Sequence, residues 1–365
     1  MKFTAEREKL LGALQAVIGV VERRQTMPVL ANVLLSVREG RLSVTATDLE
    51  VELVASTEVA SQSDGDVTIP GRKLLDICRS LPEKVQVAVA VDADKASVRG
   101  GKSRFSLSTL PASEFPVIDE INLQQTLRIS QVELRRLLDK THFSMAQQDV
   151  RYYLNGMLLE TDGKLLRTVA TDGHRLALCE ATLTVPARGA CQVIVPRKGV
   201  LELQRILNSE GDADVVVGGN HIRLTIGDIR FTSKLIDGRF PEYGRVIPAN
   251  PTRLVRTERD GLRAALQRTA ILSNEKYRGI RLAFRENLLI IQAHNPEQEE
   301  AEEEVEVNYS GEEMEVGFNV NYLLDALGAI DTDEVEIGLT DSNSSCLIRA
   351  PGTMASKYVV MPMRL

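Results

Sequence analysis

The sequence predicts an α+β chain of three tandem repeats, each with two helices packed on antiparallel sheets. Two observations support this prediction: a strand-turn-strand segment recurs at one spacing, and short amphipathic segments occur twice in each third. A fixed long period restricts the possible folds before any single motif is considered. The 365 residues divide into thirds of about 120, a size that supports an ordinary hydrophobic core.

The first recurring marker is a polar turn between two alternating stretches. Asp48, Asp172 and Asn295 occupy the turns and stand 124 and 123 positions apart. An aspartate in such a turn bonds its own backbone, so these positions predict hairpins. The three segments are residues 43–53, 167–178 and 290–297.

A second marker keeps the same register. Pro70, Pro196 and Asn319 stand 126 and 123 positions apart, and each precedes an amphipathic segment. Arg104-Phe105 followed by Phe115-Pro116 recurs as Arg230-Phe231 followed by Phe240-Pro241. Independent markers in one register favour a true repeat over a chance similarity among ordinary strand-turn-strand segments.

Six segments carry apolar residues at helical spacing, which predicts six helices. Strands are predicted between them, as in residues 85–91, and Gly218, Gly219 and Asn220 predict a hairpin turn. The helical residues are Leu10, Leu11, Leu14 and Val17; Leu74, Leu75, Ile77, Cys78 and Leu81; Leu134, Leu137 and Leu138; Val200, Leu201, Leu203, Ile206 and Leu207; Leu262, Ala265 and Leu266; and Tyr322, Leu323, Leu324 and Leu327.

Turn residues gather near positions 120–122 and 248–251, where we expect the joints between domains. The predicted domains are residues 1–122, 123–250 and 251–365. Four cysteines lie far apart without a C-x-x-C pair, which indicates buried thiols rather than disulfides or a zinc site. The first residues lack the apolar run of a signal peptide, and no stretch is long enough to span a membrane. We therefore expect a cytoplasmic protein.

The net charge of −7 conceals an uneven distribution. Residues 286–348 hold 17 Asp and Glu and no Lys or Arg, which leaves 34 acidic against 44 basic residues elsewhere, a net of +10. The sequence thus describes a mildly basic body and an acidic last third, in which seven glutamates fall within residues 297–306. Such a run predicts either a cationic partner or full exposure.

Several helices carry cations on the face opposite their apolar stripe. Arg72 and Arg79 are seven positions apart, as are Lys198 and Arg205, and Arg136 lies four before Lys140. A solvated helix face explains each pair alone, but recurrence from repeat to repeat favours a shared use. The helix predicted at 320–329 differs, because it carries only Asp325.

Catalytic motifs are absent from the sequence, which has no phosphate-binding loop, dinucleotide fingerprint, zinc-protease motif or nucleophile elbow. Asp172 and His174 are spaced like part of a catalytic triad, but no nucleophile is evident and Asp48 fills the same place without a histidine. A backbone-bonding turn explains both copies. We expect no enzyme, no cofactor and no metal.

Seven further runs carry a resemblance to a known family: residues 1–4, 103–111, 149–157, 170–176, 237–241, 295–301 and 360–365. Together with the features above, they resemble the bacterial β sliding clamps of DNA polymerase III, over the full chain. The resemblance implies the DNA clamp fold and a head-to-tail homodimer that forms a six-domain ring.

The resemblance implies an interface in which the acidic run of one copy faces cations of the other. Phe105 and Leu107 would pack on Ile271 and Leu272 as its apolar centre, while surrounding ion pairs set orientation. The predicted charged residues are Lys73, Arg99, Lys102, Arg104, Glu297, Glu300, Glu303 and Glu304.

The implied function is a processivity factor that encircles duplex DNA and touches phosphates without reading bases. Tyr152 and Tyr153 lie in a loop that resembles family loops projecting into the ring; ordinary strand packing is the alternative for both. The predicted DNA-binding residues are Arg24, Arg72, Arg79, Arg136, Gln148, Tyr152, Tyr153, Lys198 and Arg205.

The resemblance also implies a groove for short linear motifs of the replicative polymerase, the clamp loader and repair and translesion polymerases. Arg175 and Arg364 are expected to hold the polar groups of a bound peptide, and Asn343 stands where the family pattern predicts an apolar wall. The groove residues are Leu154, Thr171, Gly173, His174, Arg175, Leu176, Pro241, Arg245, Val246, Asn319, Tyr322, Ser345, Val359, Val360, Met361, Pro362, Met363 and Arg364.

Two other functions remain open from the residues alone. One is a repeat scaffold that binds only proteins, with merely solvated basic helix faces. The other is a hydrolase that uses Asp172 and His174, against which the repeat argues because only one third has the histidine. The resemblance also implies that the protein associates with the nucleoid during replication.

Overall fold

The computed structural model describes residues 1–21, 27–118 and 121–364. The chain forms two compact units, one of Met1–Val132 with Lys198–Leu235 and one of Glu133–Arg197 with Ile236–Leu365. The middle third of the sequence therefore contributes strands to both units. The division into domains of residues 1–122, 123–250 and 251–365 stays a prediction from the sequence.

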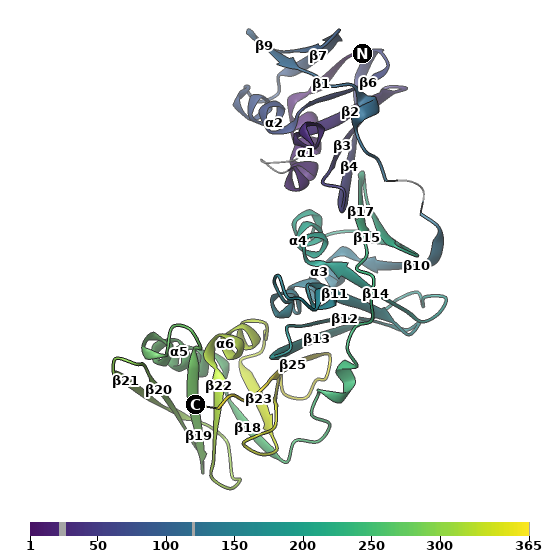
Figure 1. Ribbon diagram of the computed structural model, residues 1–365. Helices are drawn as coiled ribbons and strands as arrows, with labels where there is room; N and C mark the ends of the chain where they lie inside the picture. Colours follow the sequence, from purple (N-terminus) through teal and green to yellow (C-terminus); the bar gives the residue numbers. More distant parts are fainter. Residues whose placement is uncertain (22–26, 119–120, 365) are drawn as a thin grey trace. The chain divides into compact units, whose positions relative to one another are not determined.

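The described residues contain six α-helices, two in each third, as the spacing of apolar residues predicts (Figure 1). Their buried sides carry the predicted residues, for example Leu74, Leu75 and Cys78 in the second helix. Asn319 accepts a hydrogen bond from the backbone N–H of Asn321 and so caps the last helix. The helices are α1 Arg7–Val17, α2 Gly71–Ser80, α3 Gln131–Asp139, α4 Arg197–Ile206, α5 Arg259–Thr269 and α6 Val320–Gly328.

The first unit contains an eight-stranded antiparallel sheet and a five-stranded one. The larger has the order β10-β15-β16-β17-β4-β3-β2-β6, and the smaller β5-β1-β7-β8-β9. The strands are β1 Lys2–Glu6, β2 Asn32–Arg38, β3 Arg41–Thr47, β4 Val51–Glu58, β5 Ala60–Ser63, β6 Gly65–Pro70, β7 Gln86–Asp92, β8 Lys95–Gly100, β9 Ser103–Ser108, β10 Leu123–Ser130, β15 Asp212–Gly218, β16 His221–Ile226 and β17 Ile229–Lys234.

The second unit also contains two antiparallel sheets. One has the order β14-β11-β12-β13-β25-β24-β23-β18, and the other β21-β20-β19-β22. The strands are β11 Gly156–Thr161, β12 Leu165–Thr171, β13 Arg175–Thr182, β14 Cys191–Pro196, β18 Arg253–Glu258, β19 Gly279–Arg285, β20 Leu288–His294, β21 Glu300–Glu306, β22 Met314–Asn319, β23 Glu334–Leu339, β24 Cys346–Arg349 and β25 Ser356–Val360.

Each eight-stranded sheet takes four strands from one third of the sequence and four from the next. Antiparallel pairing of β17 with β4 joins the middle third to the first, and pairing of β13 with β25 joins it to the last. Strands β9 and β21 lie at the ends of the two smaller sheets. The described chain thus has two internal junctions, and the strands that correspond to the junction strands in the first and last thirds, β9 and β21, are edge strands.

The repeat extends to details of the backbone. The backbone N–H groups of Glu50 and Val51 donate to Asp48, and those of His174 and Arg175 donate to Asp172, which confirms the predicted turns. A crossing segment also recurs in each third: Leu110 pairs with Thr68, the Ile236 N–H donates to the Ile194 carbonyl, and Met363 pairs with Gly317. The segment around Met363 is thus paired with β22 as part of the fold.

The largest core cluster of the second unit includes buried residues of α5, α6 and the sheet that contains β19 and β20, among them Leu262, Leu323 and Phe284. The predicted buried state holds for Cys78, Cys179 and Cys346, while Cys191 is half-buried. None of the described helices is long and apolar enough to cross a lipid bilayer. Among the described residues there is also no group of His, Cys, Asp and Glu arranged to hold a metal.

Candidate functional site

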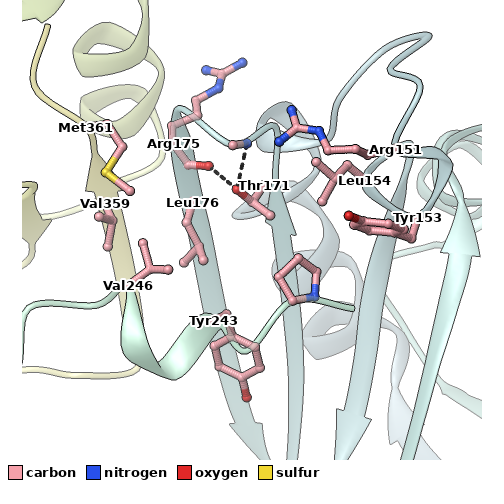
Figure 2. Close-up of a pocket in the computed structure, with 12 residues that line it drawn as sticks. Arg151, Tyr153, Leu154, Thr171, Arg175, Leu176, Tyr243, Val246, Val359 and Met361 are labelled. Atoms are coloured by element: carbon pink, nitrogen blue, oxygen red, sulfur yellow. Dashed lines mark hydrogen bonds between the residues drawn. The ribbon is translucent and has the colours of Figure 1, made fainter. Parts of the chain in front are cut away.

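The second unit contains a cavity of about 180 Å³ beside the junction of β13 and β25. Figure 2 shows Val359 and Met361 on one side of it and Leu154, Tyr153 and Arg151 on the other. Its lining is predominantly apolar, which suits an apolar ligand held by a few polar groups at the rim. The lining residues are Arg151, Tyr153, Leu154, Thr171, Gly173, Arg175, Leu176, Pro241, Tyr243, Val246, Val359 and Met361.

The floor of the cavity is part of a packed cluster. Leu176 and Val359 belong to this cluster, and Tyr243 and Val246 pack against it while remaining partly exposed. Leu154 is also buried. Leu176 and Val359 are paired residues of neighbouring strands, so their side chains share one face of the sheet. The sheet therefore provides a rigid apolar surface, and the segment that contains Tyr243 and Val246 forms a wall above it.

The rim is the turn between β12 and β13. The Thr171 hydroxyl donates to the Arg175 carbonyl at 2.6 Å and accepts from the Gly173 N–H at 3.1 Å (Figure 2). Gly173 has a φ of +90°, and a Cβ there would lie 2.9 Å from a guanidinium nitrogen of Arg151. The positive φ therefore favours glycine at this turn, whereas the Arg151 guanidinium, at the end of a flexible side chain, could move to make room for a Cβ. Because Asp172 serves the turn, it is not oriented as the partner of a catalytic histidine.

Arg151 was not predicted for the groove, yet it lies against the rim. Its guanidinium donates to both carboxylate oxygens of Asp149, at 3.0 and 2.8 Å, and to the Asp172 carbonyl at 3.2 Å. The hydrogen bonds from Arg151 lower the pKa of Asp149 to about 2. The spacing of Asp149 and Arg151 is a sequence signal for this pair, but the contact with the turn at Asp172 comes only from tertiary structure.

Two tyrosines also line the cavity. Tyr153, predicted to face DNA, lies in the short 3₁₀ turn Tyr152–Leu154 and packs against the apolar cluster. Tyr243 was not predicted; its hydroxyl donates to Glu160, and burial together with that carboxylate raises the pKa of Tyr243 to about 12. The Tyr243 ring is thus fixed at the outer wall in its neutral form.

Arg175 does not point a free guanidinium at the cavity, contrary to the role expected from the sequence. It donates to Asp172 at 3.0 Å, to Asp325 at 2.5 Å and to the Phe143 carbonyl at 2.7 Å. Its side chain is only 13% exposed. Three of its five N–H donors are therefore used within the chain, and the residue connects parts of the fold.

The other predicted groove residues lie outside the cavity lining. Val360 is buried opposite Arg175, and the Met361 N–H donates to the His174 carbonyl at 2.9 Å. Asn343 lies in an exposed turn held by Asp341 and does not form a cavity wall. The predicted residues outside the lining are His174, Arg245, Asn319, Tyr322, Ser345, Val360, Pro362, Met363 and Arg364.

The predicted DNA-binding cations of the first unit differ in their contacts. Arg79 is 53% exposed on α2, whereas Arg72 donates to the Val21 carbonyl and Lys198 pairs with Asp48. Arg205 donates to the carbonyls of Gln15 and Ala16 near the end of α1, at 2.8 and 2.5 Å. Arg24 lies outside the described residues.

In the second unit, Arg136 donates to Glu133, to the Glu180 carbonyl and to the Cys179 sulfur. Gln148 adopts a left-handed backbone with a φ of +57°, and Tyr152, four residues later, is 57% exposed. The loop thus presents Tyr152 to solvent while Tyr153 turns toward the cavity. Only part of the set predicted to face DNA is exposed and without a tight intrachain partner.

The predicted interface residues lie on several elements: Lys73 is on α2, Arg99 is on β8, and the others lie on or beside β9, β21 and the end of α5. Phe105 and Leu107 are half-buried on β9, and Ile271 is 74% exposed beyond α5. The Glu303 carboxylate accepts hydrogen bonds from Arg268 of the same chain, at 2.6 and 2.8 Å. It is therefore not available to a cation of the partner subunit in the way that the sequence predicted. Lys73, Arg99, Lys102, Arg104, Glu297, Glu300 and Glu304 are exposed, and Leu272 is half-buried.

A second, polar cavity of about 480 Å³ lies on the sheet that ends in β21. Glu302 on β21 accepts a hydrogen bond from Gln292 on β20 at 2.6 Å. Because residues two apart share a strand face, Glu300 and Glu302 lie on the face opposite Glu303. The lining residues are Arg281, Gln292, Ala293, His294, Glu300, Ala301 and Glu302.

Three family models match consecutive parts of the chain: the N-terminal, central and C-terminal domains of the DNA polymerase III beta subunit, over residues 1–119, 128–242 and 244–364. The beta sliding clamps of Pseudomonas aeruginosa and Escherichia coli K12 are 57% and 53% identical to the chain, with complete coverage of both sequences.

Solved structures agree with this match. A crystal structure of the DNA polymerase sliding clamp from Pseudomonas aeruginosa with ligand has a TM-score of 0.98 at 56% identity over both full chains. The clamp of the same organism bound to griselimycin has a TM-score of 0.97 at 57% identity, and the Caulobacter crescentus pol III beta has 0.94 at 40%, again over both full chains.

Proposed function

This chain belongs to the DNA polymerase III beta subunit family, the beta sliding clamps, and on that premise we propose that two copies close into a ring around duplex DNA. Membership confirms the family, the three-repeat clamp fold and the function expected from the sequence: a DNA sliding clamp and non-catalytic subunit of DNA polymerase III. The dimer, its contacts and the individual partners are the subject of the proposal.

The observation that supports the proposed ring is the repeated strand pairing between neighbouring thirds of the sequence. Twice within the chain, an edge strand of one third pairs antiparallel with a strand of a neighbouring third: β17 with β4, and β25 with β13. By position in the repeat, β9 is the counterpart of β17, and β21 is the counterpart of β4. A third junction of the same kind joins β9 of one copy to β21 of another, and two such junctions close a ring.

The internal junctions also supply a register. Phe231 pairs with Leu53 and Arg230 with Val54. Carried over by the repeat, this register sets Phe105 opposite Ala301 of the partner subunit and Arg104 opposite Glu302 of the partner subunit. The Arg104 side chain, the one basic group of β9, then meets the polar cavity of β21.

The opposite face of the same strands supplies the apolar part of the interface. Phe105 and Leu107 share one face of β9, and Ala301 and Val305 share the α5 face of β21. Ile271 and Leu272 follow α5 and extend this apolar surface. Exposed ion pairs contribute about 0–1 kcal/mol each, so this apolar centre provides most of the affinity and the charges set the orientation.

The ring holds DNA by closure rather than by affinity. A protein of net charge −7 binds the phosphate backbone weakly, and a few exposed cations such as Arg79 provide contacts without sequence information. Weak phosphate contacts allow sliding, while the closed ring prevents escape. Tyr152, exposed in its loop, provides a stacking surface for an unpaired base.

The apolar cavity is proposed as the docking groove for partner proteins. Its buried floor and flexible Met361 wall suit short peptide motifs with apolar side chains. A 57% identical clamp has been solved bound to griselimycin, and part of this proposal is that griselimycin occupies the cavity of this chain. We assign to the groove the replicative polymerase, the clamp loader and the repair and translesion polymerases, and place the protein in the cytoplasm with the nucleoid.

The test is retention on circular DNA. The chain is loaded onto nicked circular plasmid with a bacterial clamp loader and ATP, and then passed over a sizing column at high salt. Co-elution that persists at high salt and disappears when the plasmid is cut supports encirclement. Loss with salt alone would contradict it, because six phosphate contacts lose roughly 10³ in affinity between 50 and 200 mM salt. That result would favour a scaffold that binds only proteins.

A further inference from the structure

The rim of the groove is tied to helix α6 by one side chain. Arg175 donates through Nε to Asp172 and through one terminal nitrogen to Asp325 on α6, at 3.0 and 2.5 Å. Its other terminal nitrogen donates to the Phe143 carbonyl at 2.7 Å. The guanidinium carbon also lies 4.5 Å from the centre of the Tyr322 ring, one turn before Asp325.

Asp325 belongs to this arrangement without touching the cavity. It is absent from the cavity lining, its side chain is 45% exposed, and it lies 150 positions after Arg175 in the sequence. Helix α6 therefore holds the guanidinium from two sides, through the Asp325 carboxylate and the Tyr322 ring. A planar guanidinium held by several acceptors has few alternative positions.

The backbone of Arg175 transmits this restraint to the groove. Its carbonyl accepts the Thr171 hydroxyl, and the residue pairs with Val360 in the β13–β25 ladder. Thr171 and Leu176, on either side of the turn, both line the cavity. We expect displacement of the guanidinium to shift the rim relative to the floor at Val359 and the wall at Met361.

We propose that Asp325 is a positioning residue of the peptide groove and acts through Arg175. This inference rests on the proposed function of the cavity. It assigns Arg175 the role of holding the rim in place, rather than that of a donor to the bound peptide. It also adds Asp325, an exposed residue outside the cavity lining, to the residues that shape the groove. In the sequence, the helix that contains Asp325 differs from the others only by its lack of cations.

The chain provides a matched control. Lys140 donates to the Ala329 carbonyl just after α6 and pairs with Asp331 at 2.5 Å. Like Arg175 with Asp325, this pair links a largely buried cation of the middle third to an exposed aspartate near α6, with exposures of 13% and 81%. Neither Lys140 nor Asp331 lines the cavity. Removing Asp331 costs a comparable ion pair without disturbing the rim.

The experiment measures griselimycin binding by titration calorimetry to the full chain and to Asp325→Ala, Asp325→Asn and Asp331→Ala. We expect Asp325→Ala to weaken binding about tenfold, Asp325→Asn to weaken it less, and Asp331→Ala to leave it within about twofold of the parent, in line with coupling energies of contacting residues. In an Arg175→Ala background, Asp325→Ala should have no further effect. Melting temperatures of all variants are measured alongside.

Equal binding by Asp325→Ala and the parent, or equal losses in Asp325→Ala and Asp331→Ala, would overturn the positioning role. So would an additive loss in the double variant, because a merely structural contribution does not depend on Arg175. Met361→Ala separates the two proposals. If Met361→Ala weakens griselimycin binding while Asp325→Ala does not, the groove assignment is supported and the positioning role of Asp325 is wrong. If the parent does not bind, or Met361→Ala has no effect, the groove assignment fails and this inference with it.

Discussion

The buried carboxylate of Glu52 lies 3.9 Å from the guanidinium of Arg230 across the junction of β4 and β17. Its second oxygen accepts the Ile118 N–H at 3.0 Å. In the repeat, Arg230 corresponds to Arg104, and Glu52 corresponds by its place in the strand ladder to Glu300. The counterpart of this internal contact would join Arg104 to Glu300 of the partner subunit, which shares a strand face with Glu302, the residue that the register sets opposite Arg104.

The first prediction concerns the charges at that interface. Arg104→Glu should raise the dimer dissociation constant by about 100-fold, because like charges placed opposite each other cost several kcal/mol. Glu302→Arg should have a similar effect, and the two changes together should recover much of the loss. Sedimentation equilibrium at low micromolar concentration measures all three.

Arg128→Glu is the control for that experiment. Arg128 is an exposed cation on β10, which is also an edge strand, and it bonds to Asp212 within the chain. Its reversal should leave the dissociation constant unchanged. Two single reversals that weaken the dimer without any recovery in the pair would show that the predicted register is wrong.

The second prediction compares two methionines. Met361 lines the groove, whereas Met354 is a similarly exposed methionine elsewhere in the same unit, in contact with Arg349. Met361→Ala should weaken griselimycin binding about tenfold, since shortening the side chain removes apolar contact area of a bound ligand. Met354→Ala should not change it. Calorimetric titration measures both, and equal affinities for the two variants would contradict the groove assignment.

Much of the fold could be predicted from the sequence because it depends on local spacing. The six helices follow from apolar residues at helical intervals, and the turns at Asp48 and Asp172 follow from a side chain that bonds its own backbone. The repeat adds long-range information, because two markers in one register fix the number of units. These predictions needed no knowledge of which distant residues meet.

The rest of the site depends on contacts between distant parts of the chain. Arg175 points inward because Asp325, on a helix 150 residues later, meets it. Glu303 is withdrawn from the acidic run because alternate residues of β21 face α5, where Arg268 holds its carboxylate. The sequence of a continuous acidic run does not indicate which of its residues face a helix and which face the other side of the sheet. Tyr153 likewise turns toward the cavity through the tight turn it occupies.

The third prediction separates two cations of the first unit. Arg79→Ala should reduce the slope of log affinity against log salt for a linear duplex by about 0.9, the value for one lost phosphate contact. Arg205→Ala should leave that slope unchanged and instead lower the melting temperature, since Arg205 holds the carbonyls of Gln15 and Ala16. Fluorescence anisotropy from 20 to 150 mM salt measures the slopes. An unchanged slope for Arg79→Ala would remove α2 from the DNA-binding surface.

The fourth prediction concerns acid sensitivity at Glu336. This buried carboxylate accepts hydrogen bonds from Arg349 at 2.7 Å and Arg256 at 2.8 Å. Burial alone raises its pKa, but the two guanidinium groups outweigh burial and the pKa of Glu336 is lowered. A lowered pKa in the folded state stabilises the fold above the pKa of the unfolded chain, about 4.3, and this contribution is lost as pH falls through the folded value.

Glu336→Gln should therefore reduce the free energy of unfolding at pH 7 by about 2 kcal/mol, the scale of hydrogen bonds to charged groups. The difference from the parent should shrink as the pH falls from 5 toward 3, because the parent then loses its own carboxylate charge. Urea unfolding at a series of pH values measures both. Glu334→Gln, an exposed change on the same strand, is the control and should alter neither quantity. A difference for Glu336→Gln that stays constant down to pH 3 would mean that the paired charge is not its source.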